Sequence, residues 1–133
     1  MTGHDVVNPA GLPQPSGFNH AVVSGPGRMV WLAGQTALHV DGSVVAPGDV
    51  VAQFEQALRN LLTVLGAAGG HPGHLVSMTV YCVDIDDYRA NSQRIGQVWR
   101  QLVGTHYPAM AAVGVERLWD EQALVELQGV AVL

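Results

Sequence analysis

The clearest chemical signal in the sequence is a single carboxylate inside its last apolar stretch, ALVELQGVAVL. Side chains alternate between the two faces of an extended strand, so Glu126 and Gln128 share one face while Leu127 lies on the other. A carboxylate on a buried face costs free energy unless it is hydrogen-bonded or takes part in chemistry, such as proton transfer to or from water. The alternative is that both polar side chains lie in solvent near the edge of a sheet.

Other residues with reactive or metal-binding atoms carry weaker signals. His71 and His74 stand three apart in a turn without a third ligand nearby in sequence, so we expect no metal, and we expect no cofactor. Cys82 has no adjacent cation that would lower the pKa of its thiol, which favours an inert core residue. The chain contains no lysine, and this excludes Schiff-base and pyridoxal phosphate chemistry.

The composition indicates one cytoplasmic domain that binds neither nucleic acid nor a membrane. A chain of 133 residues has the usual size of a single domain. Its six arginines are scattered and its net charge is -5, whereas nucleic-acid binding needs clustered positive charge. The stretch MTGHDVVNPAGLPQPSG lacks the pattern of a secretory signal, and no segment reaches the roughly 20 apolar residues that span a bilayer. A single cysteine is typical of a reducing compartment.

The strands and helices that must position these residues follow the order β-β-α-β-α-β-β, which predicts an α+β fold. Residues 1–17, rich in Pro, Gly and Asn, are expected to form an irregular arm. The following apolar runs predict a hairpin and three later strands, over residues 20–25, 29–38, 75–83, 107–118 and 123–133.

Two helices are predicted between these strands. Asp49 is a good N-cap for the first, which ends at Gly69 and Gly70. Asp86 or Asp87 caps the second. The side chains of the second helix that face inward form a stripe of Tyr88, Ser92, Ile95, Trp99 and Leu102. The arginines of this helix, Arg89, Arg94 and Arg100, lie largely outside the stripe.

Several of the predicted strands are apolar on both faces, although two helices can cover only one face of the sheet. In the second strand, Val30 and Leu32 oppose Met29 and Trp31. In the third, one whole side is apolar, formed by Val76, Met78, Val80 and Cys82. An open apolar face on a chain of this size is an association surface. We therefore expect a closed homo-oligomer whose subunits bury their open sheet faces against one another.

Four pieces of sequence, together with the order of elements, resemble the RidA family, also called YjgF. They are AGQ at residues 33–35, the helix GD…QALRNL, the strand YPA…VGVERL and the ending VELQGVAV. The resemblance covers nearly the whole chain from Pro9 onward. It implies a chorismate-mutase-like fold, a mixed sheet with two helices on one face, and a homotrimer whose barrel is formed by the other face. It also implies clefts between subunits that add water to enamines or imines of 2-oxo acids and release ammonia.

The same resemblance identifies candidate site residues and one important departure. Gly34 matches a glycine whose backbone approaches the ligand, and Glu126 matches a glutamate thought to position the water. In the active deaminases an arginine directly after Pro-Ala clamps the substrate carboxylate, but this position holds Met110. Arg117 lies too far along the strand to replace it, because the stretch from Tyr107 to Leu118 aligns without a gap.

Further positions depart from the family pattern. Phe18 stands where the family has a tyrosine near the N-terminal arm, Ala33 where it has a serine, and Ala112 where it has a cysteine. Asn91 is the candidate for an asparagine contributed across the subunit interface, in a segment one residue longer here. His106 and Tyr107, at the mouth of the strand, either donate hydrogen bonds to a ligand or make interface contacts.

A cleft that lacks the arginine and keeps Glu126 is less suited to an anionic substrate. We expect a neutral or cationic ligand with an apolar part against Met110, Phe18 and Trp31. The preferred function is hydrolytic deamination of enamine- or imine-type small molecules other than the standard 2-imino acids, with Glu126 acting on water. The alternative is a trimer that binds or senses a small molecule without turnover. Ribonuclease activity, a label of some family members, disagrees with an acidic chain that has no lysine.

Overall fold

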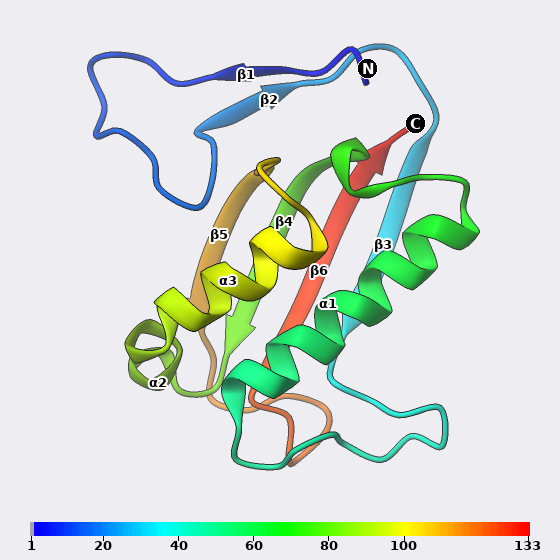
Figure 1. Ribbon diagram of the computed structural model, residues 1–133, viewed down its shortest axis with the longest axis vertical. Helices are drawn as coiled ribbons and strands as arrows, with labels where there is room; N and C mark the ends of the chain where they lie inside the picture. The colour runs from blue at the N-terminus through cyan, green and yellow to red at the C-terminus, as the bar shows by residue number, and fades with distance from the viewer. Residues whose placement is uncertain (1) are drawn as a thin grey trace.

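The computed structural model describes residues 2–133 and has the expected α+β architecture, with a mixed four-stranded sheet and helices against one face (Figure 1). The strand order is β3, β6, β4, β5. Strand β6 runs antiparallel to both of its neighbours, and β5 runs parallel to β4. The strands are β3 (Met29–Gln35), β4 (Leu75–Cys82), β5 (Ala109–Gly114) and β6 (Val125–Val132).

Helix α1 (Val50–Ala67) forms as predicted. The Asp49 side chain accepts a hydrogen bond from the backbone N–H of Ala52 at 3.0 Å, which satisfies a free donor of the first turn. Past the end of the helix Gly69 has a φ of +92°, a conformation in which glycine is favoured over residues with a Cβ. The side chains at spacings of three and four are buried against the sheet, among them Phe54, Leu58, Leu61 and Leu65.

The second helical segment differs from the prediction. It is divided into α2 (Ile85–Ala90) and α3 (Ser92–Leu102) at Asn91. The amide of Asn91 donates to the backbone carbonyl of Asp87 at 2.9 Å and so competes with the regular helical bonds. The N-cap is Asp84, whose side chain accepts from the N–H of Asp87 at 3.0 Å, rather than Asp86 or Asp87 as expected.

The N-terminal region also corrects two expectations. Residues 1–17 are not irregular throughout, because β1 (Asp5–Val7) forms there and pairs antiparallel with β2 (Ala21–Val23). The predicted hairpin between the strand at 20–25 and the next one is therefore wrong. Gly27 passes so close to the carbonyl oxygen of Leu133 that a Cβ would collide with it, and the N–H of Leu133 donates to the carbonyl of Arg28 at 2.9 Å. The turn thus lays β3 along the C-terminus instead of folding it back on β2.

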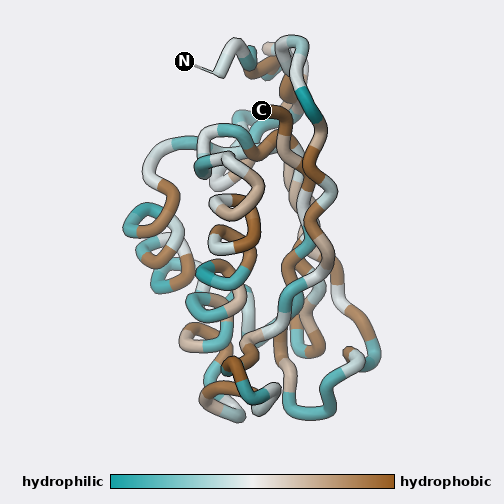
Figure 2. The backbone as a smooth tube through the Cα atoms, turned by 90° about the vertical axis from the view of Figure 1, so that its right-hand side faces the viewer, coloured by the Kyte–Doolittle hydropathy of each residue, from teal (hydrophilic) through white to brown (hydrophobic). Residues whose placement is uncertain are grey.

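The core lies between the helices and one face of the sheet (Figure 2), and the other face is open within residues 2–133. On the open face Trp31 is 72% exposed and Met29 is 53% exposed. The expectation of apolar residues on both faces holds for β3. In β4 the predicted apolar side is confirmed for Met78, Val80 and Cys82, which are buried, while the side that faces away from the helices carries Ser77, Thr79 and Tyr81.

A further result concerns membrane insertion. Across residues 2–133, no helix combines the length and the apolar character that crossing a bilayer requires.

Candidate functional site

The candidate residues fall into two groups on opposite faces of the same sheet. Gly34 and Glu126 lie on the open face. Met110 and Ala112 lie on the helix side, because their partners on the parallel strand β4, Met78 and Val80, are buried in the core. We call these groups the acidic half and the aromatic half.

The acidic half is built on a β-bulge. Between Leu32 and Gln35 strand β3 advances three residues while β6 advances two, so Ala33 and Gly34 together lie opposite Gln128. A Cβ placed on Gly34 would stand 2.9 Å from Cδ of Glu126 and collide with a carboxylate oxygen. The bulge and the glycine therefore leave room for the Glu126 side chain on the open face.

The carboxylate of Glu126 lies in a shallow hollow of about 260 Å³. The Tyr81 hydroxyl donates to Oε1 of Gln128 at 3.2 Å beside it, and Leu118 completes the wall. Within residues 2–133 the one ion pair joins Arg59 to Glu55 on α1, so no cation of the described chain neutralises Glu126. This half-buried carboxylate can accept a proton or a hydrogen bond from a small molecule.

Trp31 and Ala33 lie on the open face of the sheet, the same face as Glu126. Trp31 lies opposite Val130 in the antiparallel pair of β3 and β6. Its indole points away from the core, with 72% of its surface exposed. Trp31 and Met110 can therefore line one cleft only if they come from different subunits.

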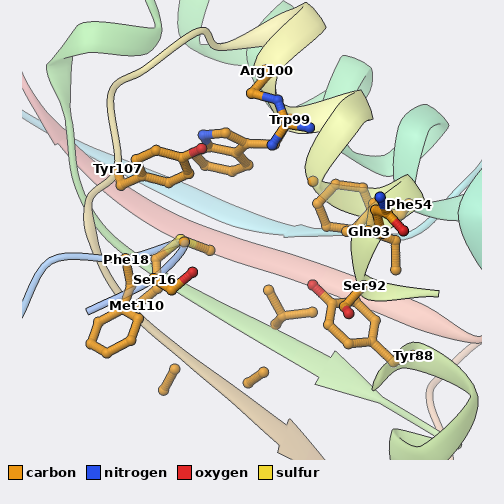
Figure 3. A pocket seen from close by; sticks show the side chains of 16 residues that line it. Ser16, Phe18, Phe54, Tyr88, Ser92, Gln93, Trp99, Arg100, Tyr107 and Met110 are labelled. Atoms are coloured by element: carbon orange, nitrogen blue, oxygen red, sulfur yellow. The ribbon is translucent and has the colours of Figure 1, made fainter. Parts of the chain in front are cut away.

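The aromatic half is a cavity of about 510 Å³ between α3 and β5 (Figure 3). The rings of Trp99 and Tyr107 stack with centroids 5.7 Å apart and an interplanar angle of 12°. Phe54 and Tyr88 meet edge to face with centroids 6.1 Å apart. The 16 lining residues are Ser16, Gly17, Phe18, Phe54, Val80, Tyr88, Ser92, Gln93, Ile95, Gly96, Trp99, Arg100, Tyr107, Met110, Ala111 and Ala112.

Hydrogen bonds from loops hold this cavity in shape. The side chain of Asn19 donates to the carbonyl of Tyr107 at 2.6 Å, and this brings the adjacent Phe18 to the cavity. The indole N–H of Trp99 donates to the carbonyl of His106 at 3.0 Å. His106 in turn donates through Nε2 to the carbonyl of Leu75 at 2.7 Å. Its ring therefore joins the loop before β5 to the start of β4 rather than facing a ligand.

Several polar residues of the cavity were missed by the sequence argument. Gln93 lines the cavity, whereas Asn91 of the same chain does not, and its amide donates to the carbonyl and to Oδ1 of Asp87 at 2.9 and 3.1 Å. The contribution of Asn91 across a subunit interface stays a prediction. Burial and then the nearby Cys82 raise the pKa of the Tyr88 phenol, which therefore remains a neutral hydrogen-bond donor.

Arg100 corrects a further expectation. The hollow beside Met110 was predicted to contain no basic residue, but Arg100 lines the same cavity. Figure 3 shows it at the end beyond Trp99, away from Met110 and Phe18. A Cβ built on Gly96 would lie 3.5 Å from Nη1 of Arg100, so the guanidinium folds back over this glycine one turn earlier in α3. Helical periodicity placed the Cα of Arg100 outside the inward stripe of the helix. Its long side chain nevertheless folds back toward Gly96 and so reaches the cavity.

The two other candidates from the sequence, the pair of His71 with His74 and the thiol of Cys82, have structural surroundings. Nδ1 of His74 accepts from the N–H of His71 at 3.0 Å, and Nδ1 of His71 accepts from the N–H of Gly73 at 3.2 Å. The described chain, residues 2–133, has no group of three His, Cys, Asp or Glu side chains that could hold a metal ion. Burial raises the pKa of the Cys82 thiol to about 11, as an inert core thiol requires.

Comparisons with known proteins agree on one family. The family model described as endoribonuclease L-PSP matches residues 12–133. Protein DfrA of Myxococcus xanthus is 33% identical over 86% of this chain and 84% of its own. The 2-iminobutanoate/2-iminopropanoate deaminase of Capra hircus is 32% identical over 79% of this chain and 73% of its own.

Solved structures give the same result. YyfB of the conserved Rid protein family from Yersinia pestis has a TM-score of 0.88 at 34% identity, covering 98% of this chain and 99% of that one. Escherichia coli TdcF, solved with bound serine, has a TM-score of 0.70 at 25% identity, covering 97% and 98%.

Proposed function

Because the chain belongs to the RidA/YjgF family, whose model is described as endoribonuclease L-PSP, we propose that it adds water to enamine- or imine-type small molecules and releases ammonia. The observation that carries this proposal is the unpaired carboxylate of Glu126 in a hollow kept open by Gly34. A relative that is 32% identical bears the name of a 2-imino acid deaminase, which supports the reaction class.

The proposed site is complete only between subunits. Glu126 and Met110 lie on opposite faces of one sheet, so a small substrate cannot touch both within one chain. Subunits that pack their open faces together would bring the acidic half of one chain near the aromatic half of another. The exposed side chains of Trp31 and Met29 support such packing. We propose a homotrimer with one site at each subunit boundary; the number three comes from the family resemblance.

In the proposed reaction the Glu126 carboxylate takes a proton from water as the water oxygen bonds to the imine carbon. The carbon–nitrogen double bond becomes single and its electron pair goes to nitrogen, which takes up a proton. Transfer of the remaining hydroxyl proton and cleavage of the carbon–nitrogen bond then release ammonia and a carbonyl compound. Gly34 would let the backbone of β3 approach the reacting carbon closely.

Met110 argues against the standard 2-imino acids as substrates. Their carboxylate is bonded to the imine carbon and needs a cation at that position, preferably a bidentate arginine. Met110 offers only an apolar surface there, and the nearby Phe18 and Ala112 add no charge. We therefore propose imines without a carboxylate on the reacting carbon.

The test is imine hydrolysis by the native protein, Glu126→Gln and Met110→Arg. A flavin-dependent oxidase generates imines in situ, either from a primary amine or from leucine, and semicarbazide traps the imine that escapes hydrolysis. The native protein should lower trapping of the amine-derived imine, and Glu126→Gln should abolish this effect. Met110→Arg should increase activity on the leucine-derived imine. Equal rates for the native protein and Glu126→Gln would refute the catalytic role.

One observation favours the non-catalytic alternative. Phe18, Ala33 and Ala112 each lack the hydroxyl or thiol that the resemblance leads us to expect, so the pocket retains few reactive groups. If the protein hydrolysed neither the amine-derived nor the leucine-derived imine, but a ligand raised its melting temperature, a binding or sensing trimer would be supported.

A further inference from the structure

The aromatic half of the site has a charged end that the proposed reaction leaves without a role. Arg100 is the one charged residue among the residues that line the cavity, all of which lie in the described part of the chain. Its guanidinium lies over Gly96, at the end of the cavity beyond Trp99 (Figure 3). The cavity is therefore asymmetric, with a cation at one end and Met110 with Phe18 at the other.

The guanidinium of Arg100 is free to bind an anion. It forms no ion pair and no hydrogen bond with any of residues 2–133, and no carboxylate lines the cavity. Arg94 differs, because its Nη1 lies 3.5 Å from Oδ1 of Asn91 and it does not line the cavity. Guanidinium groups match carboxylates in shape and form two parallel hydrogen bonds to them.

Between the two ends the walls suit an apolar and planar body. Tyr107, backed by the stacked ring of Trp99, forms one side, and Tyr88, backed by Phe54, forms another; Trp99 and Phe54 are themselves buried. A volume of about 510 Å³ is in the range of small-molecule pockets. Aromatic groups bind well between such rings.

We propose that this cavity binds an organic carboxylate with an aromatic or bulky apolar body, its carboxylate on Arg100 and its body between the rings. A single guanidinium balances a monoanion, whereas a dianionic phosphate would leave one charge uncompensated among apolar walls. Resting on the proposed function, the inference extends to the substrate: an imine that carries its carboxylate at the end remote from the reacting carbon. The proposed ligand is an anion, so this inference reverses the expectation of a neutral or cationic ligand.

The test is binding of phenylbutyrate, measured by titration calorimetry, with the neutral phenylbutyramide as a matched probe. Arg100→Gln should weaken phenylbutyrate binding by about tenfold or more and leave phenylbutyramide binding unchanged, because only the carboxylate meets the guanidinium. Arg94→Gln, which removes the same charge from the same helix, should bind phenylbutyrate like the native protein. Melting temperatures of both variants check that they fold.

The opposite outcomes overturn the inference. No binding of phenylbutyrate at millimolar concentration, an equal effect of Arg94→Gln, or an equal loss for phenylbutyramide would each exclude a carboxylate site at Arg100. Imine kinetics are measured in parallel for Glu126→Gln, which removes the proposed catalytic carboxylate and keeps Arg100, so that the reaction and the carboxylate site are tested separately. Binding that depends on Arg100 together with unchanged imine kinetics in Glu126→Gln would refute the proposed reaction and leave the carboxylate site standing.

Discussion

Gly34 lies directly against the carboxylate of Glu126, so that a Cβ on Gly34 would stand 2.9 Å from Cδ of Glu126 and nearer still to an oxygen. Gly34→Ala should therefore push the carboxylate out of its position without forbidding the backbone conformation, since Gly34 has no positive φ. We expect imine hydrolysis to fall by about a hundredfold, because small displacements of a catalytic group cost that much. Steady-state rates on the amine-derived imine measure this.

The control for Gly34→Ala removes the group that it strikes. In a Glu126→Ala background the three atoms nearest to the added methyl are gone, so Gly34→Ala should change the free energy of unfolding much less than it does with Glu126 present. If Gly34→Ala destabilised both backgrounds equally, the close contact between these residues would not be the cause.

Trp31→Asp should dissociate the proposed homo-oligomer. The indole is 72% exposed on the open face of the sheet, and a buried carboxylate at a subunit contact would lack a partner. Sedimentation velocity at micromolar concentration measures the change from oligomer to monomer. Trp119→Asp is the matched control, because Trp119 is 95% exposed and lies outside the sheet. A native protein that already sediments as a monomer would contradict the prediction.

Gln53→Leu should destabilise the fold by about 2–4 kcal/mol. The buried Gln53 amide donates to the carbonyls of Gln122 and Ala46 at 3.0 and 3.3 Å and accepts from the N–H of Leu124 at 2.8 Å. Leucine would leave the carbonyl of Gln122 and the N–H of Leu124 without these partners, while the carbonyl of Ala46 still accepts from the N–H of Asp49 at 3.0 Å. Urea unfolding at fixed protein concentration measures the loss. Gln101→Leu, at an exposed position of α3, should change the unfolding free energy by less than about 0.5 kcal/mol. If the two substitutions lowered the free energy of unfolding equally, this prediction would be contradicted.

His74 should make the protein less stable in mild acid. Burial, followed by the nearby His71 and His4, lowers the pKa of His74 below its ordinary 6.5, so the unfolded chain binds a proton more readily than the folded one. The free energy of unfolding therefore falls as the pH drops through about 6.5, and this loss ends below the lowered folded pKa. Solvent screening keeps the effect small.

The measurement for His74 compares the native protein with His74→Gln by urea unfolding at a series of pH values between about 5 and 8. The native protein should lose more stability on acidification than the variant. Parallel curves for the two proteins would show that His74 makes no such contribution.

The sequence by itself determined the elements whose patterns are local. Spacings of three and four with an Asp49 cap suffice for α1, because helical contacts join residues close in sequence. Alternation in β6 correctly separated Glu126 from Leu127. Short sequence motifs were also enough to identify the family. They likewise show that position 110 holds methionine where the active deaminases have arginine.

The tertiary structure decided what depends on long-range pairing and on side-chain reach. Only the strand register shows that Glu126 and Met110 lie on opposite faces, because alternation gives relative and not absolute directions. Strand β2 pairs with β1 while β3 pairs with β6, and the helix break at Asn91 coincides with a side-chain hydrogen bond. Arg100 enters the aromatic cavity because its chain folds back over a glycine, and residue spacing alone does not specify that path.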